Sequence, residues 1–205
     1  ARTVLRDARV RAAVLETARG GLLRRGLVAR DARVAVVTNV SADHFGEYGI
    51  HTLADIAAVK LLVAKGLGVD GLLVLNADDA MLTAHAPGAH RLGWFALALA
   101  DAQARGPLAC GGRAGRLVLA VDDAEHDLGG IADMPLTLGG SARYNLGNIA
   151  AASLAAHALG IAPTTIAGVL ARFGASNADN PGRLQRWTFG DVQVLLDYAH
   201  NPDGL

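Results

Sequence analysis

The stretch VAVVTNVSADHFGEYGIHTLADIAAVK, residues 34–60, contains a strand pattern, a polar loop and a helix pattern in direct succession. Residues 34–37 are apolar, mostly β-branched and followed by polar residues, which predicts a buried strand of a parallel sheet. Thr52 and Asp55 have the spacing of a helix start, and apolar residues recur at helical intervals after them as far as Lys60. The stretch therefore predicts a strand–loop–helix unit of an α/β fold.

The loop of this unit carries Asp43 and His44. In open α/β sheets, ligands bind beyond the carboxyl ends of the strands, so these two residues and Lys60 can converge on one pocket. In the alternative interpretation, Asp43 caps a turn while His44 and Lys60 are solvated. Both interpretations fit the stretch taken alone.

Lysine is used sparingly in this chain. Lys60 and Lys65 are the only lysines, and the remaining residues of the Lys and Arg total are arginines. Because a lysine amine can act as a nucleophile or carry a carbamate, whereas a guanidinium stays protonated, this segment is a candidate for a required primary amine. Helix phase favours Lys60 as the residue that faces the pocket, with chance as the alternative.

Further apolar runs predict the rest of the sheet. Residues 12–15 are expected to form a strand that ends at Glu16, and residues 71–75 a buried strand that ends in Asn76, Asp78 and Asp79. Peripheral strands are expected at 91–97 and 117–121. Strand, helix and strand at about 30 residues per unit predict βαβ crossovers, and hence a mostly parallel sheet with flanking helices.

The remainder is predicted to contain loops, two helices and a hairpin. The expected elements are a turn-rich loop at 128–140, helices at 144–159 and 163–171, a polar boundary loop at 176–181, and a hairpin at 183–189 and 192–196. In the first turn of the first helix, Asn145 and Asn148 either cap the helix or hydrogen-bond a base edge.

The composition argues against several classes of partner. Of the 205 residues, 52% are hydrophobic, which is ample for a packed core. The 19 Lys and Arg residues balance the 19 Asp and Glu residues, so no electrostatic footprint for nucleic acid or an anionic membrane is visible. Cys110 is the only cysteine, which excludes an internal disulfide and fits a reducing compartment. Neither a signal peptide nor an apolar run long enough to cross a bilayer is evident.

Several short strings agree in type and order with one family. They are ETARGG from Glu16, TNVSADH from Thr38, TLADIAAVK ending at Lys60, LNADD from Leu75, YNLGNIAAA from Tyr144, NPGR from Asn180 and DYAHNPDGL from Asp197. Through these strings, nearly the whole chain resembles the Mur ligase superfamily, and ETARGG and DYAHNP most resemble the Mur-ligase-like part of the cyanophycin synthetases. The resemblance implies the family's central ATPase domain over residues 1–178 and the beginning of a C-terminal α/β domain over residues 179–205.

The activity implied by this resemblance is that of an ATP-dependent amide ligase. A carboxylate is phosphorylated by ATP, and an amine then displaces phosphate from the acyl phosphate. In the cyanophycin synthetases, arginine is joined through its α-amine to the side-chain carboxylate of an aspartate in the growing polymer. Matching positions make Glu16, His44 and Lys60 the implied catalytic and metal set: Glu16 and His44 as Mg²⁺ ligands, and Lys60 as a carbamylated lysine that holds a second Mg²⁺.

The nucleotide-binding residues are likewise implied by the resemblance. Asn145 and Asn148 match the segment that contacts adenine, and Arg183 matches an arginine that reaches a nucleotide phosphate. Asp197 and His200 match positions of the C-terminal domain that meet ribose and phosphate when the domains close.

The chain also departs from the family pattern. No GxxxxGK[ST] phosphate loop occurs in these residues, although the family requires one, so we expect a fragment that is inactive alone and follows that loop in its parent protein. We expect the parent to be a cytoplasmic homo-oligomer that acts on arginine and an Asp-containing polymer and binds neither nucleic acid nor membrane. The alternatives are a peptidoglycan-precursor or folylpolyglutamate ligase, a noncatalytic nucleotide-binding or scaffold module, and a metal-dependent hydrolase, for which His51, His85 and His90 lack the ligand spacing.

Overall fold

The computed structural model describes residues 2–42, 45–46 and 48–198. Within them, six strands form one sheet in the order β1-β2-β3-β4-β5-β6. The strands are β1 (Ala32–Val37), β2 (Leu67–Asn76), β3 (Arg91–Ala98), β4 (Ala109–Arg113), β5 (Arg116–Val121) and β6 (Ala124–Gly130). Strands β1 to β4 are parallel, and β5 and β6 continue the sheet as antiparallel neighbours. The predicted α/β fold with a mostly parallel sheet is confirmed.

Helices precede β1, connect the parallel strands and follow the last strand of the sheet. They are α1 (Arg2–Arg6), α2 (Arg19–Arg25), α3 (Leu53–Leu61), α4 (Ala80–His85), α5 (Leu99–Gln103), α6 (Arg143–Ala158) and α7 (Pro163–Leu170), with 3₁₀ turns η1 (Leu62–Gly66), η2 (Ile131–Asp133) and η3 (Pro135–Thr137). The predicted start of α3 is a complete capping box, because the Thr52 side chain accepts from the Asp55 backbone N–H and the Asp55 carboxylate accepts from the Thr52 backbone N–H. Both predicted C-terminal helices are confirmed, and Gly160 after α6 has a positive φ of 86°, which is common for the residue that ends a helix.

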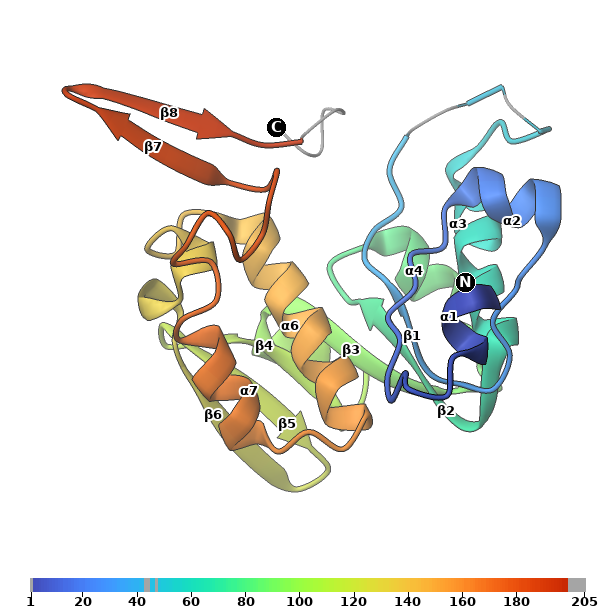
Figure 1. The fold of residues 1–205 in the computed structure, drawn as a ribbon. Coiled ribbons are helices and arrows are strands. Elements are labelled where there is room, and N and C mark those ends of the chain that lie inside the picture. The colour runs from blue at the N-terminus through green and yellow to red at the C-terminus, as the bar shows by residue number, and fades with distance from the viewer. Residues whose placement is uncertain (1, 43–44, 47, 199–205) are drawn as a thin grey trace.

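Helices cover both faces of the sheet (Figure 1). On one face, Leu72 and Val74 of β2 pack in a cluster with side chains of α6 and α7. On the other face, Leu73 and Leu75 pack in a cluster with side chains of η1, α4 and α5. Because successive residues of a strand point to opposite faces, β2 contributes to both clusters and is buried throughout residues 71–75.

The sheet differs from the sequence predictions in three places. Strand β3 was expected at the periphery, but it lies between β2 and β4, with Trp94 and Phe95 buried on opposite faces. Strand β4 was not predicted, because it lies in a glycine-rich stretch. A Cβ on Gly111 would lie only 2.8 Å from the Ala96 carbonyl oxygen, so the glycine permits close contact with the backbone of β3. The predicted loop at 128–140 starts within β6, a polar strand at the edge of the sheet, and continues as η2 and η3.

The predicted strand at residues 12–15 was also wrong. The chain has no regular secondary structure over residues 12–18, and Val14 is 95% exposed. In the described part of the chain, β1 is the edge strand and pairs with β2 alone, so the run at 12–15 does not extend the sheet past β1 and has no strand partner. A short apolar run does not form a strand without such a partner.

The predicted hairpin is confirmed as a second, separate sheet of β7 (Gln185–Phe189) and β8 (Val192–Leu196). Its turn contains Gly190 with a φ of 59°. Asn177 joins the preceding loop to β7, since its side-chain amide donates to the Arg186 carbonyl at 2.7 Å and its oxygen accepts from the Arg186 backbone N–H at 2.9 Å. A domain boundary near residue 178 stays a prediction.

Candidate functional site

The carboxyl ends of β1 and β2 are cross-linked by side chains. Asn76, the last residue of β2, donates from its amide to the Thr38 carbonyl at 3.0 Å, directly after β1. The amide oxygen of Asn76 accepts from the Asp78 backbone N–H at 2.9 Å. Asn76 therefore holds the loop that leaves β1 beside the loop that leaves β2.

Asp78 and Asp79 extend this network to two further segments. Asp79 accepts from the Val40 backbone N–H at 2.5 Å with one oxygen, while the other caps α4 at Met81 and Leu82. Asp78 accepts from the Leu97 backbone N–H at 2.8 Å, near the end of β3. The sequence predicted polar side chains at this edge but missed their anchoring role, because that role depends on how three loops meet.

Lys60 reaches the same edge of the sheet from α3. Its Nζ donates to the Asn39 carbonyl at 2.7 Å, two residues beyond β1, and the residue is half-buried. Lys60 thus lies at the end of β1, and its predicted place in a ligand pocket stays a prediction. Asp43 and His44 follow in the same loop but lie outside the described residues, so their predicted roles stay predictions.

Glu16, the other predicted metal ligand, is exposed in the irregular segment 12–18. Among residues 2–42, 45–46 and 48–198, no three or more His, Cys, Asp or Glu side chains gather closely enough to hold a metal ion. A Mg²⁺ site of Glu16, His44 and Lys60 needs the undescribed His44 as well as a carbamate on Lys60.

The first turn of α6 carries the two predicted base-contacting amides. Asn145 is half-buried, and its amide donates to the Leu136 carbonyl at 2.8 Å, which ties α6 to η3. Asn148 is exposed, and its amide nitrogen lies 3.5 Å from the side-chain oxygen of Asn145. Asn145 thus has a structural contact, while Asn148 presents polar atoms to solvent.

The hairpin brings two further predicted residues near this turn. The Asp197 carboxylate accepts from the Leu184 backbone N–H at 2.9 Å. Burial raises the pKa of Tyr144, at the start of α6, and the negative charge of Asp197 raises it further. Arg183 precedes β7, and its guanidinium lies 5.2 Å from the centre of the Tyr198 ring. His200 lies outside the described residues.

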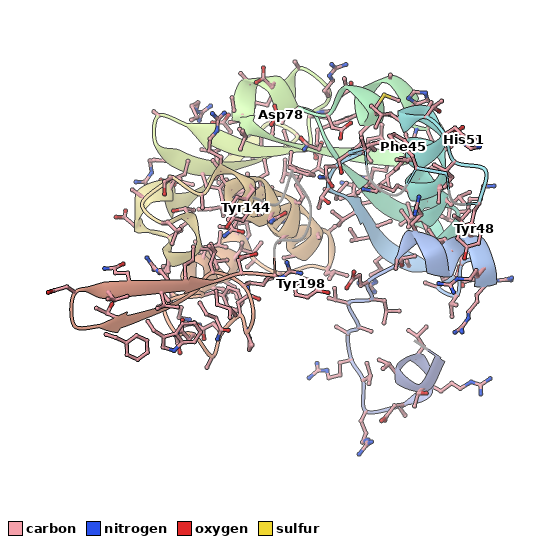
Figure 2. The ribbon with its side chains drawn as sticks, turned by 90° about the horizontal axis from the view of Figure 1, so that it is seen from above. Phe45, Tyr48, His51, Asp78, Tyr144 and Tyr198 are labelled. Atoms are coloured by element: carbon pink, nitrogen blue, oxygen red, sulfur yellow. The ribbon has the colours of Figure 1, made fainter. Side chains whose placement is uncertain are left out.

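These residues share one end of the molecule. In Figure 1 the hairpin, the start of α6 and the loops that follow the parallel strands all lie at the top. Figure 2 looks onto this end and shows Asp78, Phe45, Tyr144 and Tyr198 arranged across it. The structure thus brings the ends of β1 and β2, the start of α6 and the hairpin to one side, as the crevice rule for open sheets predicts.

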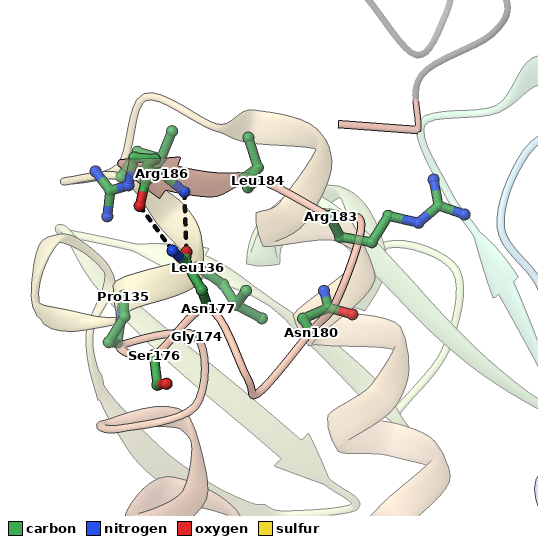
Figure 3. Close-up of a pocket in the computed structure, with 10 residues that line it drawn as sticks. Pro135, Leu136, Gly174, Ser176, Asn177, Asn180, Arg183, Leu184 and Arg186 are labelled. Atoms are coloured by element: carbon green, nitrogen blue, oxygen red, sulfur yellow. Dashed lines mark hydrogen bonds between the residues drawn. The ribbon is translucent and has the colours of Figure 1, made fainter. Parts of the chain in front are cut away.

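A small cavity lies where the hairpin meets η3 (Figure 3). Its volume is about 10 Å³, and its lining includes Leu136, Asn180 and Arg183. A volume of this size holds about one water molecule, far less than a nucleotide needs. The cavity is a packing feature of the junction and not the nucleotide site.

The structure also bears on the single cysteine and on the question of a membrane-spanning helix. Cys110 is fully buried in β4, and burial raises the pKa of its thiol, so this side chain belongs to the core. Among the described residues, no helix is both long and apolar enough to span a bilayer.

Comparison with known proteins identifies the family. Residues 2–156 match the Mur ligase middle domain. The chain therefore belongs to the Mur ligase middle-domain family, as its short strings predicted.

Within that family, the chain is similar to cyanophycin synthetases. It is 39% identical over 208 residues to the cyanophycin synthetase of Nostoc sp. (strain PCC 7120 / SAG 25.82 / UTEX 2576). The aligned region covers 98% of this chain and 23% of the relative. It is 33% identical over 208 residues to a UDP-N-acetylmuramoyl-L-alanyl-D-glutamate--2,6-diaminopimelate ligase of Xanthomonas campestris pv. campestris (strain 8004), covering 98% of this chain and 39% of that protein. The chain thus spans about a quarter of the length of its cyanophycin synthetase relatives.

A solved structure supports the fold. MurF from Acinetobacter baumannii superposes with a TM-score of 0.58 at 19% identity, covering 84% of this chain and 35% of that one. The mostly parallel sheet with flanking helices is thus the architecture of this family.

Proposed function

We propose that this chain is the central portion of an ATP-dependent amide ligase of the cyanophycin synthetase type. The observation that carries the proposal is the contact of Lys60 with the Asn39 carbonyl at the carboxyl end of β1, in a member of the Mur ligase middle-domain family. The contact brings the ε-amino nitrogen to the edge of the sheet where open α/β proteins bind ligands. The similarity to cyanophycin synthetases over 98% of the chain supports the choice of ligase.

In the proposed reaction, the side-chain carboxylate of an aspartate in the polymer attacks the γ-phosphorus of ATP. An acyl phosphate forms, and ADP leaves. The α-amine of arginine then attacks the acyl carbon, the acyl–oxygen bond to phosphate breaks, and the amine loses a proton as the amide forms. Binding both reactants in one closed site lowers the entropic cost of the second step.

The chain's own residues have distinct proposed roles in this reaction. Glu16, His44 and a carbamylated Lys60 would hold Mg²⁺, which neutralises charge on the phosphate oxygens when bound. The carbamate is needed because Lys60 as an ammonium would repel the cation. The other proposed contacts are Asn145 and Asn148 to adenine, Arg183 to a phosphate, and Asp197 and His200 to ribose and phosphate.

The wider setting is part of the same proposal. The parent protein would be a cytoplasmic homo-oligomer whose partners are arginine and an Asp-containing polymer, and not nucleic acid or membrane. The phosphate loop that the reaction requires would be supplied by the parent protein outside these residues. This chain alone would not turn over ATP.

A second candidate is a ligase that makes a peptidoglycan precursor. The observation that favours it is the 33% identity to the diaminopimelate-adding ligase of Xanthomonas campestris. The two candidates share the acyl-phosphate chemistry and differ in acceptor and amine.

Phosphate release by the full-length parent protein distinguishes the candidates. The assay contains ATP, Mg²⁺, an aspartate-bearing primer and arginine, and each component is omitted in turn. Release that requires both primer and arginine is expected for the cyanophycin-type ligase. Release only with a UDP-linked peptide acceptor and diaminopimelate would establish the second candidate, and no release with either pair would refute both.

A further inference from the structure

Arg183 and Tyr198 lie side by side at the open end of the hairpin. Arg183 precedes β7 and Tyr198 follows β8, and the Tyr198 backbone N–H donates to the Gly182 carbonyl at 2.9 Å. The Leu184 backbone N–H donates to the Asp197 carboxylate at 2.9 Å, so the two segments are tied on both sides of Arg183. This backbone framework sets the guanidinium carbon 5.2 Å from the centre of the Tyr198 ring, within cation–π range.

The stacked geometry leaves the guanidinium able to bind an anion. A guanidinium stacks on an aromatic ring through its face, whereas its N–H groups lie in its plane and point outward. In the described part of the chain, Arg183 has no ion pair with a carboxylate, and the residue is exposed. Figure 3 shows its side chain directed away from Asn177 and Arg186. Among the described residues, the Arg183 side chain thus extends from an exposed position with its N–H groups available to a ligand.

The stack lies close to the start of α6. Asp197, next to Tyr198 in the chain, is near enough to Tyr144 for its charge to act on that phenol. Figure 2 shows Tyr144 and Tyr198 on the same end of the molecule. Through its contact with Tyr198, the Arg183 guanidinium therefore lies at the same end of the molecule as Tyr144, at the start of α6.

We propose that Tyr198 is a positioning residue for Arg183, whose stacked guanidinium presents its N–H edge to a phosphate of the bound nucleotide. This inference rests on the proposed function. An arginine side chain that is already ordered loses less conformational entropy when it binds phosphate, so the stack improves nucleotide affinity without contacting the nucleotide. The ring face does the positioning, so a phenylalanine can replace the tyrosine.

The test is ATP kinetics of the full-length parent protein with Tyr198→Leu, Tyr198→Phe and Arg183→Gln. We expect Tyr198→Leu to raise the KM for ATP roughly two- to fivefold with little change in kcat, and Tyr198→Phe to retain the original KM. In the Arg183→Gln background, Tyr198→Leu should have no further effect, because there is no guanidinium left to position. Phe189→Leu is the matched control, since Phe189 and Tyr198 are both 65% exposed and belong to the same hairpin region.

The outcomes separate this inference from the proposed function. If Tyr198→Leu raises the KM equally in the wild-type and the Arg183→Gln protein, or if Tyr198→Phe causes the same rise, the positioning role is overturned. The proposed ligase activity is unaffected by either result. A wild-type protein without ATP-dependent phosphate release would refute the ligase and the inference together. Thermal unfolding of each variant checks folding, and Tyr198→Phe keeps the test decisive if the leucine variant is unstable.

Discussion

The carboxyl end of β2 and the β7–β8 hairpin carry the two halves of the proposed site, and they are built in opposite ways. Residues 71–75 of β2 are buried on both faces, and the side chains that follow hydrogen-bond the loop after β1, the start of α4 and the end of β3. In the hairpin, Gln185 is half-buried and every other residue of β7 and β8 is exposed. An isolated two-stranded hairpin is only marginally stable in water. The comparison suggests that the Lys60 side of the site is held rigidly, whereas the Arg183 side is held by a few local hydrogen bonds.

The two tryptophans of the chain allow the regions to be followed separately. Trp94 is buried in β3, and Trp187 lies in β7. Replacing one tryptophan by phenylalanine leaves the other as a fluorescence reporter of its own region. Each stability prediction below can therefore be assigned to the sheet or to the hairpin.

The largest expected effect is that of truncating a leucine in β2. Leu73→Ala should lower the free energy of unfolding by about 2–5 kcal/mol, because Leu73 is fully buried and its loss leaves a cavity. Leu195→Ala, the same change at an exposed position of β8, should lower the free energy of unfolding by less than about 1 kcal/mol. Urea unfolding followed by Trp94 fluorescence measures the first variant, and by Trp187 fluorescence the second. Equal losses would contradict the comparison.

The next effect concerns catalysis by the full-length parent protein. Lys60→Ala should lower ligation at least about 100-fold, because a carbamylated lysine would be lost from the proposed Mg²⁺ site. Folding should remain intact, since Lys60 is only half-buried. A small carboxylic acid such as acetate should restore part of the activity.

Lys65→Ala is the matched control for that variant, because Lys65 is the other lysine of the chain and is exposed on η1. We expect its rate of phosphate release to equal that of the unaltered protein. Normal activity of Lys60→Ala would remove the carbamate role, and an equal loss in both variants would show that the segment, and not Lys60, matters.

A smaller effect is expected for the anchoring carboxylate of Asp79. Asp79→Ala should lower the free energy of unfolding by about 1–2 kcal/mol, because both the cap of α4 and the hydrogen bond from the Val40 N–H are lost. Amide hydrogen exchange at Val40 should accelerate more than exchange within β2. Asp123→Ala, at an exposed position, serves as the control. Unchanged exchange at Val40 would mean that Asp79 does not fix the loop after β1.

The same contrast explains which features the sequence predicted. Local signals were sufficient for β1, the capping box at Thr52 and Asp55, the two helices after residue 142 and the hairpin, because their patterns are complete within each segment. Strand β4 was missed, because Gly111 is explained only by its contact with the backbone at Ala96. A run at residues 12–15 was overpredicted, because pairing depends on a neighbour that the run itself does not specify.

Prediction of the site had a similar limit. The position of Lys60 followed from helix phase, because α3 begins where its capping box places it. The roles of Asn76, Asp78 and Asp79 did not follow, since they depend on contacts between loops distant in sequence. Tyr198 was overlooked for the same reason: its partner Arg183 precedes β7, whereas Tyr198 follows β8, so the two are separated in sequence by the whole hairpin.

The smallest expected effect is a pH dependence that arises at the carboxyl-terminal end of α6. In the described part of the chain, Nδ1 of His157 is buried without a hydrogen-bond partner, and its ring lies 6.4 Å from that of His126. Burial lowers the pKa of His157, and the charges of His126 and Arg91 lower it further. Because the unfolded chain then binds this proton more readily, stability should be retained above about pH 6.5 and lost as the pH falls through the lowered pKa.

His157→Leu should flatten this part of the profile, measured as urea unfolding by Trp94 fluorescence between about pH 7 and about pH 5. His85→Leu, which removes an exposed histidine of α4, should leave the profile as it was. An unchanged profile in His157→Leu would assign the pH dependence to other groups. His157 lies near His126 of β6, and no residue of β7 or β8 is among the groups that shift its pKa. We therefore expect Trp94 to report the change in stability. A change reported only by Trp187 would assign the pH dependence to the hairpin and contradict the view that α6 and the sheet unfold together.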